Sequence, residues 1–137
     1  MTAWELRVRY HECDPQGVAF NAGYFAWADM GSFELWRAAF GGYQRVVDAG
    51  FETVVVAAEG SFRRPARFDD LLHATTEVSA IGRTSFALTT RFTRHGDEVA
   101  SITVRYVFVG HDLDGSMPPS DEIAAALRRV AGDVTTD

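Results

Sequence analysis

Cysteine and long apolar runs are both scarce in this chain, and each shortage excludes a class of protein. Cys13 is the single cysteine among 137 residues, so no disulfide can form within the chain, which fits the reducing cytoplasm. No run of about 18 residues lacks polar interruption, so we expect no transmembrane helix and no membrane partner. The N-terminal residues Glu5, Arg7 and Arg9 interrupt any apolar signal-peptide core.

Basic residues are also fewer than acidic residues. The chain has 13 basic and 19 acidic residues, a net charge of −6, whereas nucleic-acid binding needs clustered cations. We therefore expect no nucleic-acid partner. The histidines at positions 11, 73, 95 and 111 lack metal-ligand spacing, and no Walker or dinucleotide-binding glycine motif occurs. We expect neither a metal nor a cofactor.

The apolar content is high enough for one ordered domain over residues 1–137. Hydrophobic residues make up 47% of the chain and aromatic residues 12%. Apolar alternation predicts strands over 4–12, 53–61, 71–81, 85–94 and 99–109, and apolar runs predict helices over 22–40, 43–49 and from about Ser120. The helix over 22–40 has so few polar residues that we expect burial on nearly all sides. This order of elements is an α+β pattern.

The segment from His11 to Asn21 places one carboxylate at a strand-to-helix bend. Asp14-Pro15-Gln16-Gly17 is a turn sequence, because Pro presets φ and Gly allows positive φ. An acid at this point lies beside the start of a helix, where unpaired N–H groups favour negative charge. Asp14 is therefore either a turn-stabilising residue or a reacting carboxylate beside donors that stabilise an oxyanion.

Two blocks of the sequence match a known family. The matching residues are Asp14 to Val18, Tyr24, Trp27, Asp29, residues 62–71 and residues 81–86. These blocks resemble the hotdog-fold acyl-CoA thioesterases, specifically the 4-hydroxybenzoyl-CoA thioesterase family. The resemblance implies a hotdog fold: a long apolar helix wrapped by a curved antiparallel sheet of about five strands, with a short C-terminal helix. It also implies a homodimer or homotetramer with active sites at the dimer interface.

The resemblance assigns Asp14 to attack on a thioester carbonyl or to activation of water. A thiolate with a pKa near ~8.5 is a good leaving group. Attack by the carboxylate forms a mixed anhydride that water then hydrolyses, and general-base catalysis is the alternative. The oxyanion role falls to the backbone N–H groups of Asn21, Ala22 and Gly23 at the helix start. The side chain of Asn21 either caps the helix or contacts substrate.

Five further residues are candidates for substrate contact. Gly17 either lets the backbone pass close to substrate or serves the turn alone, and Val18 and Tyr24 belong to the matched block. Asp29 is either a buried carboxylate paired with Arg, Ser or Thr, or, by the resemblance, an acceptor for a phenolic hydroxyl of the acyl group. Glu59 is a fallback second carboxylate or a solvated one.

Several arginines are candidates for binding the phosphates of coenzyme A, since a guanidinium offers bidentate donors. Ordinary surface charge is the alternative for each. In the resembled family, the nucleotide-contacting turn stands where this chain has Arg83-Thr84-Ser85. The candidates are Arg63, Arg64, Arg67, Arg83, Thr84 and Ser85.

Together these observations predict an acyl-CoA thioesterase that acts on an aromatic or medium-chain acyl group. Two alternatives remain. One is a thioesterase for acyl groups held by an acyl-carrier protein, whose acidic surface would meet Arg63, Arg64 and Arg67. The other is a non-catalytic protein that binds acyl-CoA or a small apolar ligand.

Overall fold

The fold is a single curved sheet with one long helix in its curl. The computed structural model describes residues 1–132 and the backbone of residues 135 and 136. In chain order the elements are β1 (Thr2–Arg7), a 3₁₀ turn (Tyr10–Glu12), α1 (Gly23–Phe40), α2 (Tyr43–Asp48), β2 (Glu52–Phe62), β3 (Leu71–Ile81), β4 (Ser85–Arg94), β5 (Asp97–Val109), α3 (Asp121–Ala131) and β6 (Thr135–Thr136).

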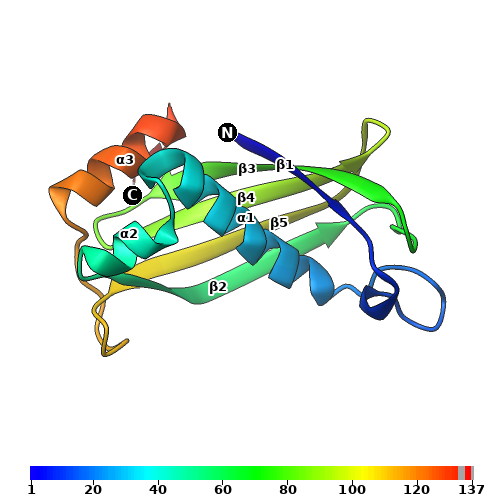
Figure 1. Cartoon of the computed structure of the whole chain (residues 1–137), viewed down its shortest axis with the longest axis horizontal. Coiled ribbons are helices and arrows are strands. Elements are labelled where there is room, and N and C mark those ends of the chain that lie inside the picture. Colours follow the sequence, from blue (N-terminus) through cyan, green and yellow to red (C-terminus); the bar gives the residue numbers. More distant parts are fainter. Residues whose placement is uncertain (133–134, 137) are drawn as a thin grey trace.

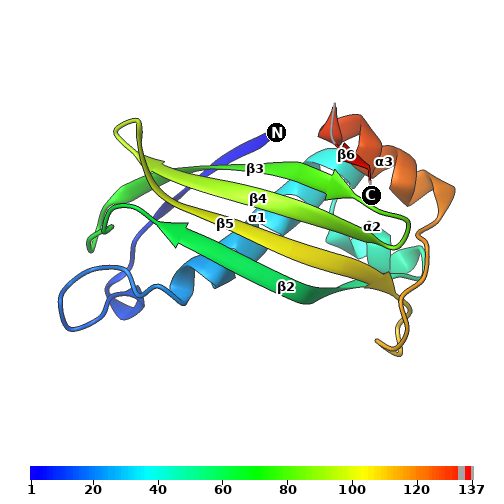
Figure 2. The same ribbon diagram turned by 180° about the vertical axis from the view of Figure 1, so that it is seen from behind.

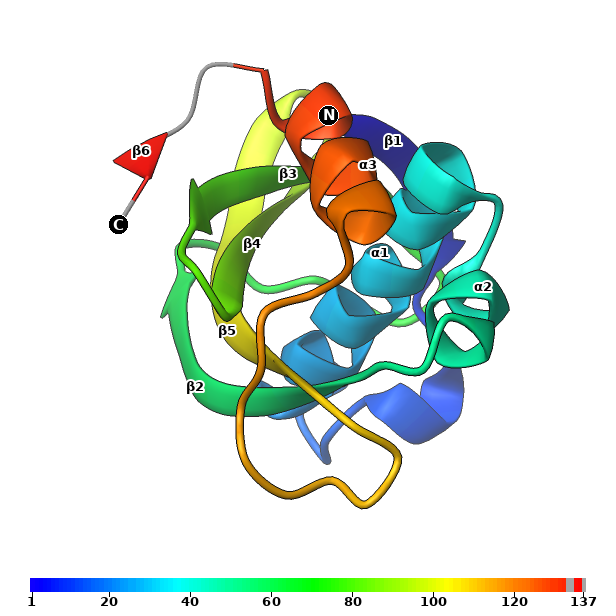
Figure 3. The same ribbon diagram turned by 90° about the vertical axis from the view of Figure 1, so that its left-hand side faces the viewer.

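The sheet follows the order β1-β3-β4-β5-β2, and every neighbouring pair in that order is antiparallel. The short β6 runs parallel to β3. Figure 1 shows α1 lying across one face of the sheet, and Figure 3 shows the sheet curling around that helix from the end that carries α3. This is the α+β hotdog fold, so the expected fold class is confirmed.

Alternation along the strands separates the two faces of the sheet. On β5, Ile102, Val104, Tyr106 and Phe108 are buried, and the intervening residues 103, 105 and 107 are only partly covered. The buried set packs with α1 residues such as Trp36 in one hydrophobic core. The opposite face carries no helix in the described part of the chain, as Figure 2 shows from behind.

The element boundaries agree with the sequence for most of the chain. β3 and β4 have the predicted bounds, the other predicted elements except the first strand are within two residues, and Gly41 ends α1 in the left-handed conformation (φ 82°). The predicted start of α3 near Ser120 is also confirmed, and the Ser120 hydroxyl caps the helix by accepting the Ile123 N–H at 3.3 Å. The strand β6 was not predicted.

The prediction of a first strand reaching residue 12 is wrong. β1 ends at Arg7, and a 3₁₀ turn occupies Tyr10–Glu12. The apolar alternation continues inward only as far as Val8, which is fully buried, whereas Tyr10 is 79% exposed. The Glu12 carboxylate accepts the N–H of Arg9 at 2.7 Å and closes the turn, a local bond that alternation does not reveal.

The prediction that α1 is buried on nearly all sides is also wrong. Its buried face includes Trp27 and Trp36, but Met30 is 48% exposed and Phe33 is 44% exposed. Asp29 lies on the same exposed face. The sheet covers one side of the helix, and nothing among the residues that the structure describes covers this apolar strip.

The distance between α1 and the sheet is set by one close contact. The Thr76 hydroxyl accepts the Trp4 indole N–H at 3.0 Å and lies 2.9 Å from the hydroxyl of Thr90. Both threonines are buried, and Gly31 of α1 faces them. A methyl group at position 31 would overlap the Thr76 hydroxyl oxygen and press on Thr90 and Trp4. Glycine is therefore required here by space, although it lowers helix propensity.

We predict that Gly31→Ala lowers the free energy of unfolding by about 1–3 kcal/mol, because overpacking outweighs the gain in helix propensity. Urea unfolding measures the difference. Gly23→Ala is the matched control, since nothing lies within 4 Å of its added methyl group. Equal stability of the two variants would contradict the close-packing argument.

Candidate active site

The segment between the 3₁₀ turn and α1 folds into a tight hairpin. Cys13 pairs with Ala19, and the N–H of Asp14 donates to the Val18 carbonyl at 2.9 Å. The N–H of Gly17 donates to the Asp14 carbonyl at 2.9 Å, and Gly17 has φ 79°, which requires glycine. The predicted turn is therefore present, and it presents Asp14 at its first position.

The two oxygens of the Asp14 carboxylate have different hydrogen-bond environments. Oδ1 accepts the N–H of Gln16 at 2.9 Å and that of Val18 at 3.4 Å. No donor among the described residues reaches Oδ2. The turn-stabilising interpretation is thus satisfied by one oxygen, and the other is left for chemistry.

The start of α1 offers backbone donors beside this hairpin. The helix is preceded by Ala22 at its N-cap, with no side-chain cap, so the capping role considered for Asn21 is absent. The N–H of Gly23 already donates to Phe20 at 2.9 Å. Among the described residues, no acceptor meets the N–H groups of Asn21 and Ala22.

A hollow of about 230 Å³ lies between the hairpin, the start of α1 and the segment that follows β2. Its floor is aromatic and its rim carries two arginines. The lining residues are Val18, Ala19, Asn21, Tyr24, Phe62, Arg63, Arg64 and Pro65. The fold therefore brings together five of the residues that the sequence singled out.

Tyr24 forms the rigid part of this floor. Its ring is only 2% exposed and meets the rings of Trp27, Phe62 and Phe92 edge-on, with centroids 4.8 to 5.6 Å apart. Burial raises the pKa of Tyr24 to about 12, so its hydroxyl stays neutral at physiological pH. A neutral, buried phenol lines a pocket and does not act as a base.

The segment between β2 and β3, residues 63–70, borders the hollow and is called the rim segment. One ion pair holds it to the end of β4. The Arg94 guanidinium lies 2.5 Å from the Asp70 carboxylate and also donates to the Pro65 carbonyl at 3.1 Å. The N–H of Arg67 donates to the same carboxylate at 2.8 Å. Partial burial opposes ionisation of Asp70, but the Arg67 N–H and the Arg94 guanidinium outweigh it and lower the pKa of this carboxyl.

The predicted phosphate-binding residues fall into two groups. Arg63 pairs with Glu98 at 2.7 Å, whereas Arg64 and Arg67 have no side-chain partner within the described ranges. Residues 83–85 lie in the β3–β4 turn, at the opposite end of α1 from the hairpin (Figure 1). One chain therefore does not bring Arg83, Thr84 and Ser85 to the hollow, and their contact with coenzyme A stays a prediction.

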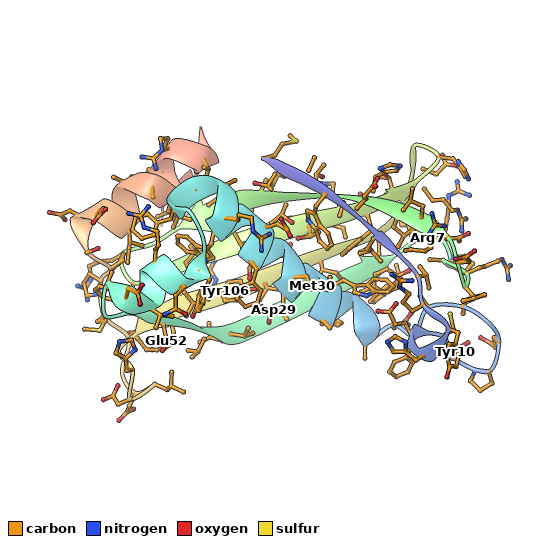
Figure 4. The ribbon with its side chains drawn as sticks, in the orientation of Figure 1. Arg7, Tyr10, Asp29, Met30, Glu52 and Tyr106 are labelled. Atoms are coloured by element: carbon orange, nitrogen blue, oxygen red, sulfur yellow. The ribbon has the colours of Figure 1, made fainter. Side chains whose placement is uncertain are left out.

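Asp29 lies in the middle of α1 and has a partner that the sequence did not suggest. The Tyr106 hydroxyl, from β5, donates to Asp29 Oδ1 at 2.8 Å, and Figure 4 shows the two side chains well away from Tyr10 at the hairpin end. Burial and the Asp29 charge raise the pKa of Tyr106. The expected buried carboxylate paired with Arg, Ser or Thr is wrong, because Asp29 is exposed and its side chain pairs with Tyr.

The remaining candidates lie outside the hollow. Glu59 is exposed on β2 and faces the open side of the sheet with Thr103 and Arg105. Burial and the neighbouring charges of Asp14 and Glu12 raise the pKa of the Cys13 thiol, which keeps it protonated and a poor nucleophile. Among the described residues no group of three His, Cys, Asp or Glu side chains is placed to hold a metal ion.

Two features of the site were missed by sequence reasoning. Phe62 and Pro65 line the hollow. A sequence-based prediction of their position would have required the direction in which the chain turns after β2. The Glu12 carboxylate accepts the indole N–H of Trp27 at 2.8 Å, a contact between residues 15 apart that carries no local pattern.

Comparison with known proteins places this geometry in a family. Residues 16–101 match the family described as the thioesterase superfamily. The chain is 23% identical over 115 residues to a putative esterase of Aquifex aeolicus, covering 84% of this chain and 90% of that one. It is 31% identical over 88 residues to the acyl-CoA thioester hydrolase YbgC of Escherichia coli, covering 64% of this chain and 66% of YbgC.

A solved structure shows the same fold. The Thermus thermophilus protein TT1821 superposes with a TM-score of 0.88 at 24% identity, covering 95% of this chain and 99% of that one. This chain belongs to the thioesterase superfamily and is a thioester hydrolase. The resemblance and the expected reaction class are confirmed. No helix among the described residues has the length and apolarity to cross a membrane.

We predict that Arg94→Met weakens the pH dependence of stability at low pH. The folded-state pKa of Asp70 lies below its unfolded value of about 3.9, so the pair stabilises the protein above that pH. This contribution is lost as the pH falls through the folded-state pKa. Urea unfolding at pH 7 and pH 3 should show a smaller difference for the variant than for wild type.

Arg83→Met serves as the control, because its guanidinium has no ion-pair partner in the described chain. The same pH dependence in Arg94→Met and wild type would contradict the assigned role of the ion pair.

Proposed function

We propose that this protein hydrolyses acyl-CoA thioesters to the free acid and coenzyme A, with Asp14 as the reacting carboxylate. One observation carries the proposal. Asp14 stands in a hairpin beside an aromatic-floored hollow and the start of α1, with Oδ2 uncommitted and two N–H groups without acceptors nearby. The name of the relative YbgC, an acyl-CoA thioester hydrolase, supports coenzyme A as the thiol carrier.

In the proposed reaction, Asp14 Oδ2 attacks the thioester carbonyl or takes a proton from the attacking water. The two N–H bonds to Oδ1 hold the carboxylate in place, so little orientation is lost at the moment of reaction. In the first route a carbon–oxygen bond forms, the carbon–sulfur bond breaks and the thiolate leaves. Water then hydrolyses the mixed anhydride. In the second route Asp14 takes a proton from water as the water oxygen bonds to the carbonyl carbon, and the carbon–sulfur bond then breaks to release the thiolate.

The N–H groups of Asn21 and Ala22 are the proposed oxyanion donors. They point from the start of α1, where the helix dipole also favours negative charge, and removal of one such donor typically costs about 2.7–4 kcal/mol. Gly23 is a weaker candidate than the sequence suggested, because its N–H is already bonded to Phe20. Asn21 lines the hollow, which supports substrate contact as the role of its side chain.

A second copy of the chain completes the proposed site. β2 ends the sheet and carries the exposed Val55 and Val56, while α1 carries the exposed Met30 and Phe33. An uncovered strand edge beside an apolar strip favours pairing with another chain. Pairing of two β2 edges in antiparallel fashion would bring the middle of one α1 towards the hairpin end of the other.

This arrangement gives Asp29 a role in recognition of the acyl group. Tyr106 occupies Oδ1, which leaves Oδ2 as an acceptor on the face that the second copy covers. A phenolic hydroxyl on an aromatic acyl group would donate to it. Arg63 and Arg64 line the hollow, and Arg67 follows them in the same segment, so we expect these three to bind the coenzyme A phosphates; the turn Arg83-Thr84-Ser85 contributes only if it comes from another chain.

We predict that Asp14→Asn lowers kcat for thiol release by roughly 10²–10⁴-fold, the scale of general-base catalysis. The fold should persist, because the Asn carbonyl oxygen can still accept the N–H groups of Gln16 and Val18. Thiol release from a panel of aryl- and alkyl-CoA thioesters measures the effect, and urea unfolding checks the fold. Wild-type turnover in the variant would exclude Asp14 as the reacting group.

We predict that Asp29→Asn raises KM for 4-hydroxybenzoyl-CoA by about 10-fold or more, since a hydrogen bond to a charged group contributes about 1.5–3 kcal/mol. The amide retains an acceptor for Tyr106, so packing should be kept. Benzoyl-CoA lacks the hydroxyl and is the control substrate. Equal changes for both substrates would contradict recognition of the hydroxyl by Asp29.

Refolding Asp14→Asn chains together with Asp29→Asn chains tests whether two chains share a site. If the two chains share each site, a mixed dimer has one site in which one chain supplies the native Asp14 and the other supplies the native Asp29. Efficient hydrolysis of 4-hydroxybenzoyl-CoA then returns. Absence of any gain on mixing would place both residues in the site of a single chain.

Acyl groups on a carrier protein are the second candidate substrate. The observation in favour is that Arg64, which lines the hollow, and the nearby Arg67 have no ion-pair partner among the described residues, so an acidic carrier surface would complement them. Parallel assays with free CoA thioesters and carrier-bound thioesters separate the two. A higher kcat/KM for the carrier-bound form that falls on Arg64→Ala would favour the carrier.

A further inference from the structure

Glu12 connects every part of the hairpin that carries Asp14. Its Oε1 accepts the N–H of Arg9 at 2.7 Å, and its Oε2 accepts the Trp27 indole N–H at 2.8 Å. Its backbone carbonyl accepts the N–H of Phe20 at 2.9 Å, across the hairpin. One residue, two positions before Asp14, therefore bonds to the 3₁₀ turn, to the returning strand of the hairpin and to α1.

The α1 end of this connection is rigid. Trp27 is 3% exposed, and its ring packs against Tyr24 with centroids 4.8 Å apart and against Phe92 at 6.0 Å. It lies one turn into the helix whose start offers the free N–H groups of Asn21 and Ala22. A bond from Trp27 to Glu12 thus ties the hairpin to the same rigid body that holds those donors.

We propose that Glu12 and Trp27 are positioning residues that fix the distance between the Asp14 carboxylate and the N–H groups at the start of α1. The catalytic part of this inference rests on the proposed function. Glu12 itself is not a second base, because both of its carboxylate oxygens already accept hydrogen bonds. A charged acceptor gives a shorter and stronger bond than a neutral one, which suits a link that must hold two segments in register.

The bond is also the main polar link that the hairpin side chains make with the interior of α1. The other polar contacts of residues 12–20 in the described chain stay within residues 9–20, reach Ala66 and Phe68 after β2, or join the Phe20 carbonyl to the N–H of Gly23 at the first residue of α1. Loss of the indole bond would leave the hairpin attached through the chain itself and through the rim. A shift of about 1 Å between reacting groups can reduce a rate by about 100-fold.

Trp27→Phe removes the indole N–H and keeps an aromatic ring in the core. We expect kcat for thiol release to fall by about 10- to 100-fold with little change in KM, because the hollow is kept and the reacting groups are displaced. Glu12→Gln retains one acceptor oxygen and should lose less than Glu12→Ala. In the double variant Trp27→Phe with Glu12→Ala, the losses of kcat should not multiply, since both substitutions remove the same bond between Glu12 and the Trp27 indole.

Trp4→Phe is the matched control. Trp4 also donates an indole N–H, to Thr76 at 3.0 Å, but it lies on β1 away from the hairpin. It should lower stability and leave kcat unchanged. An equal loss of kcat in the two variants would show a general effect of destabilisation and overturn the positioning role.

Hydrogen exchange at the hairpin amides tests the position of the hairpin without any substrate. The N–H groups of Asp14 and Phe20 are bonded within the hairpin and should exchange faster in Trp27→Phe than in wild type or Trp4→Phe. Unchanged exchange together with unchanged kcat would overturn the inference. Faster exchange with no thiol release by wild type from any substrate would retain the structural link and reject the proposed function instead.

Discussion

The wrapping of one sheet around one helix is the constraint on which the other features depend. A sheet of five long strands can bury its inner face only if a single helix fills the curl, so α1 must come close to the strands. Gly31 makes that approach possible over the Thr76 and Thr90 pair. The same geometry leaves one side of α1 and the edge of β2 without a neighbour in the described part of the chain. Core packing and the proposed need for a second copy thus have one origin.

The position of the candidate site follows from the same arrangement. The chain must turn from β1 to α1 at the end of the curl, and the hairpin that makes this turn carries Asp14 to the start of the helix. The rim segment returns from β2 to the same end, where the Asp70–Arg94 pair holds it to β4. The hairpin with Asp14, the start of α1 and the lining residues that follow β2 therefore lie at the same end of the fold, although the lining residues after β2 are far from the hairpin in sequence.

Most of the sheet could be predicted from the sequence because its signals are local. The alternation of β3 and β4 and the His95-Gly96 turn before β5 need no information from elsewhere in the chain. The turn that begins at Asp14 could also be predicted, since Pro15 and Gly17 mark it, whereas the role of Asp14 in the reaction stays a prediction. The early end of β1 was not found, because the Glu12 side chain closes a turn where apolar alternation still suggests a strand.

Contacts between distant residues account for what the sequence could not give. The exposed strip of α1 appears only when the width of the sheet is known, because composition alone makes the helix look buried on all sides. Tyr106 as the partner of Asp29 joins residues 77 apart, and Trp27 as the partner of Glu12 joins residues 15 apart. Neither spacing is a pattern of any one helix or strand.

The different roles of the two oxygens of Asp14 have an evolutionary consequence. The hairpin needs an acceptor at Oδ1, which Asn supplies as well as Asp, whereas the reaction proposed for Asp14 needs the negative charge. A single-base change in the Asp codon gives Asn, so a duplicated gene can lose hydrolysis without losing the fold. Acyl-CoA carriers or sensors can therefore arise from this scaffold in one mutational step, with the pocket already in place.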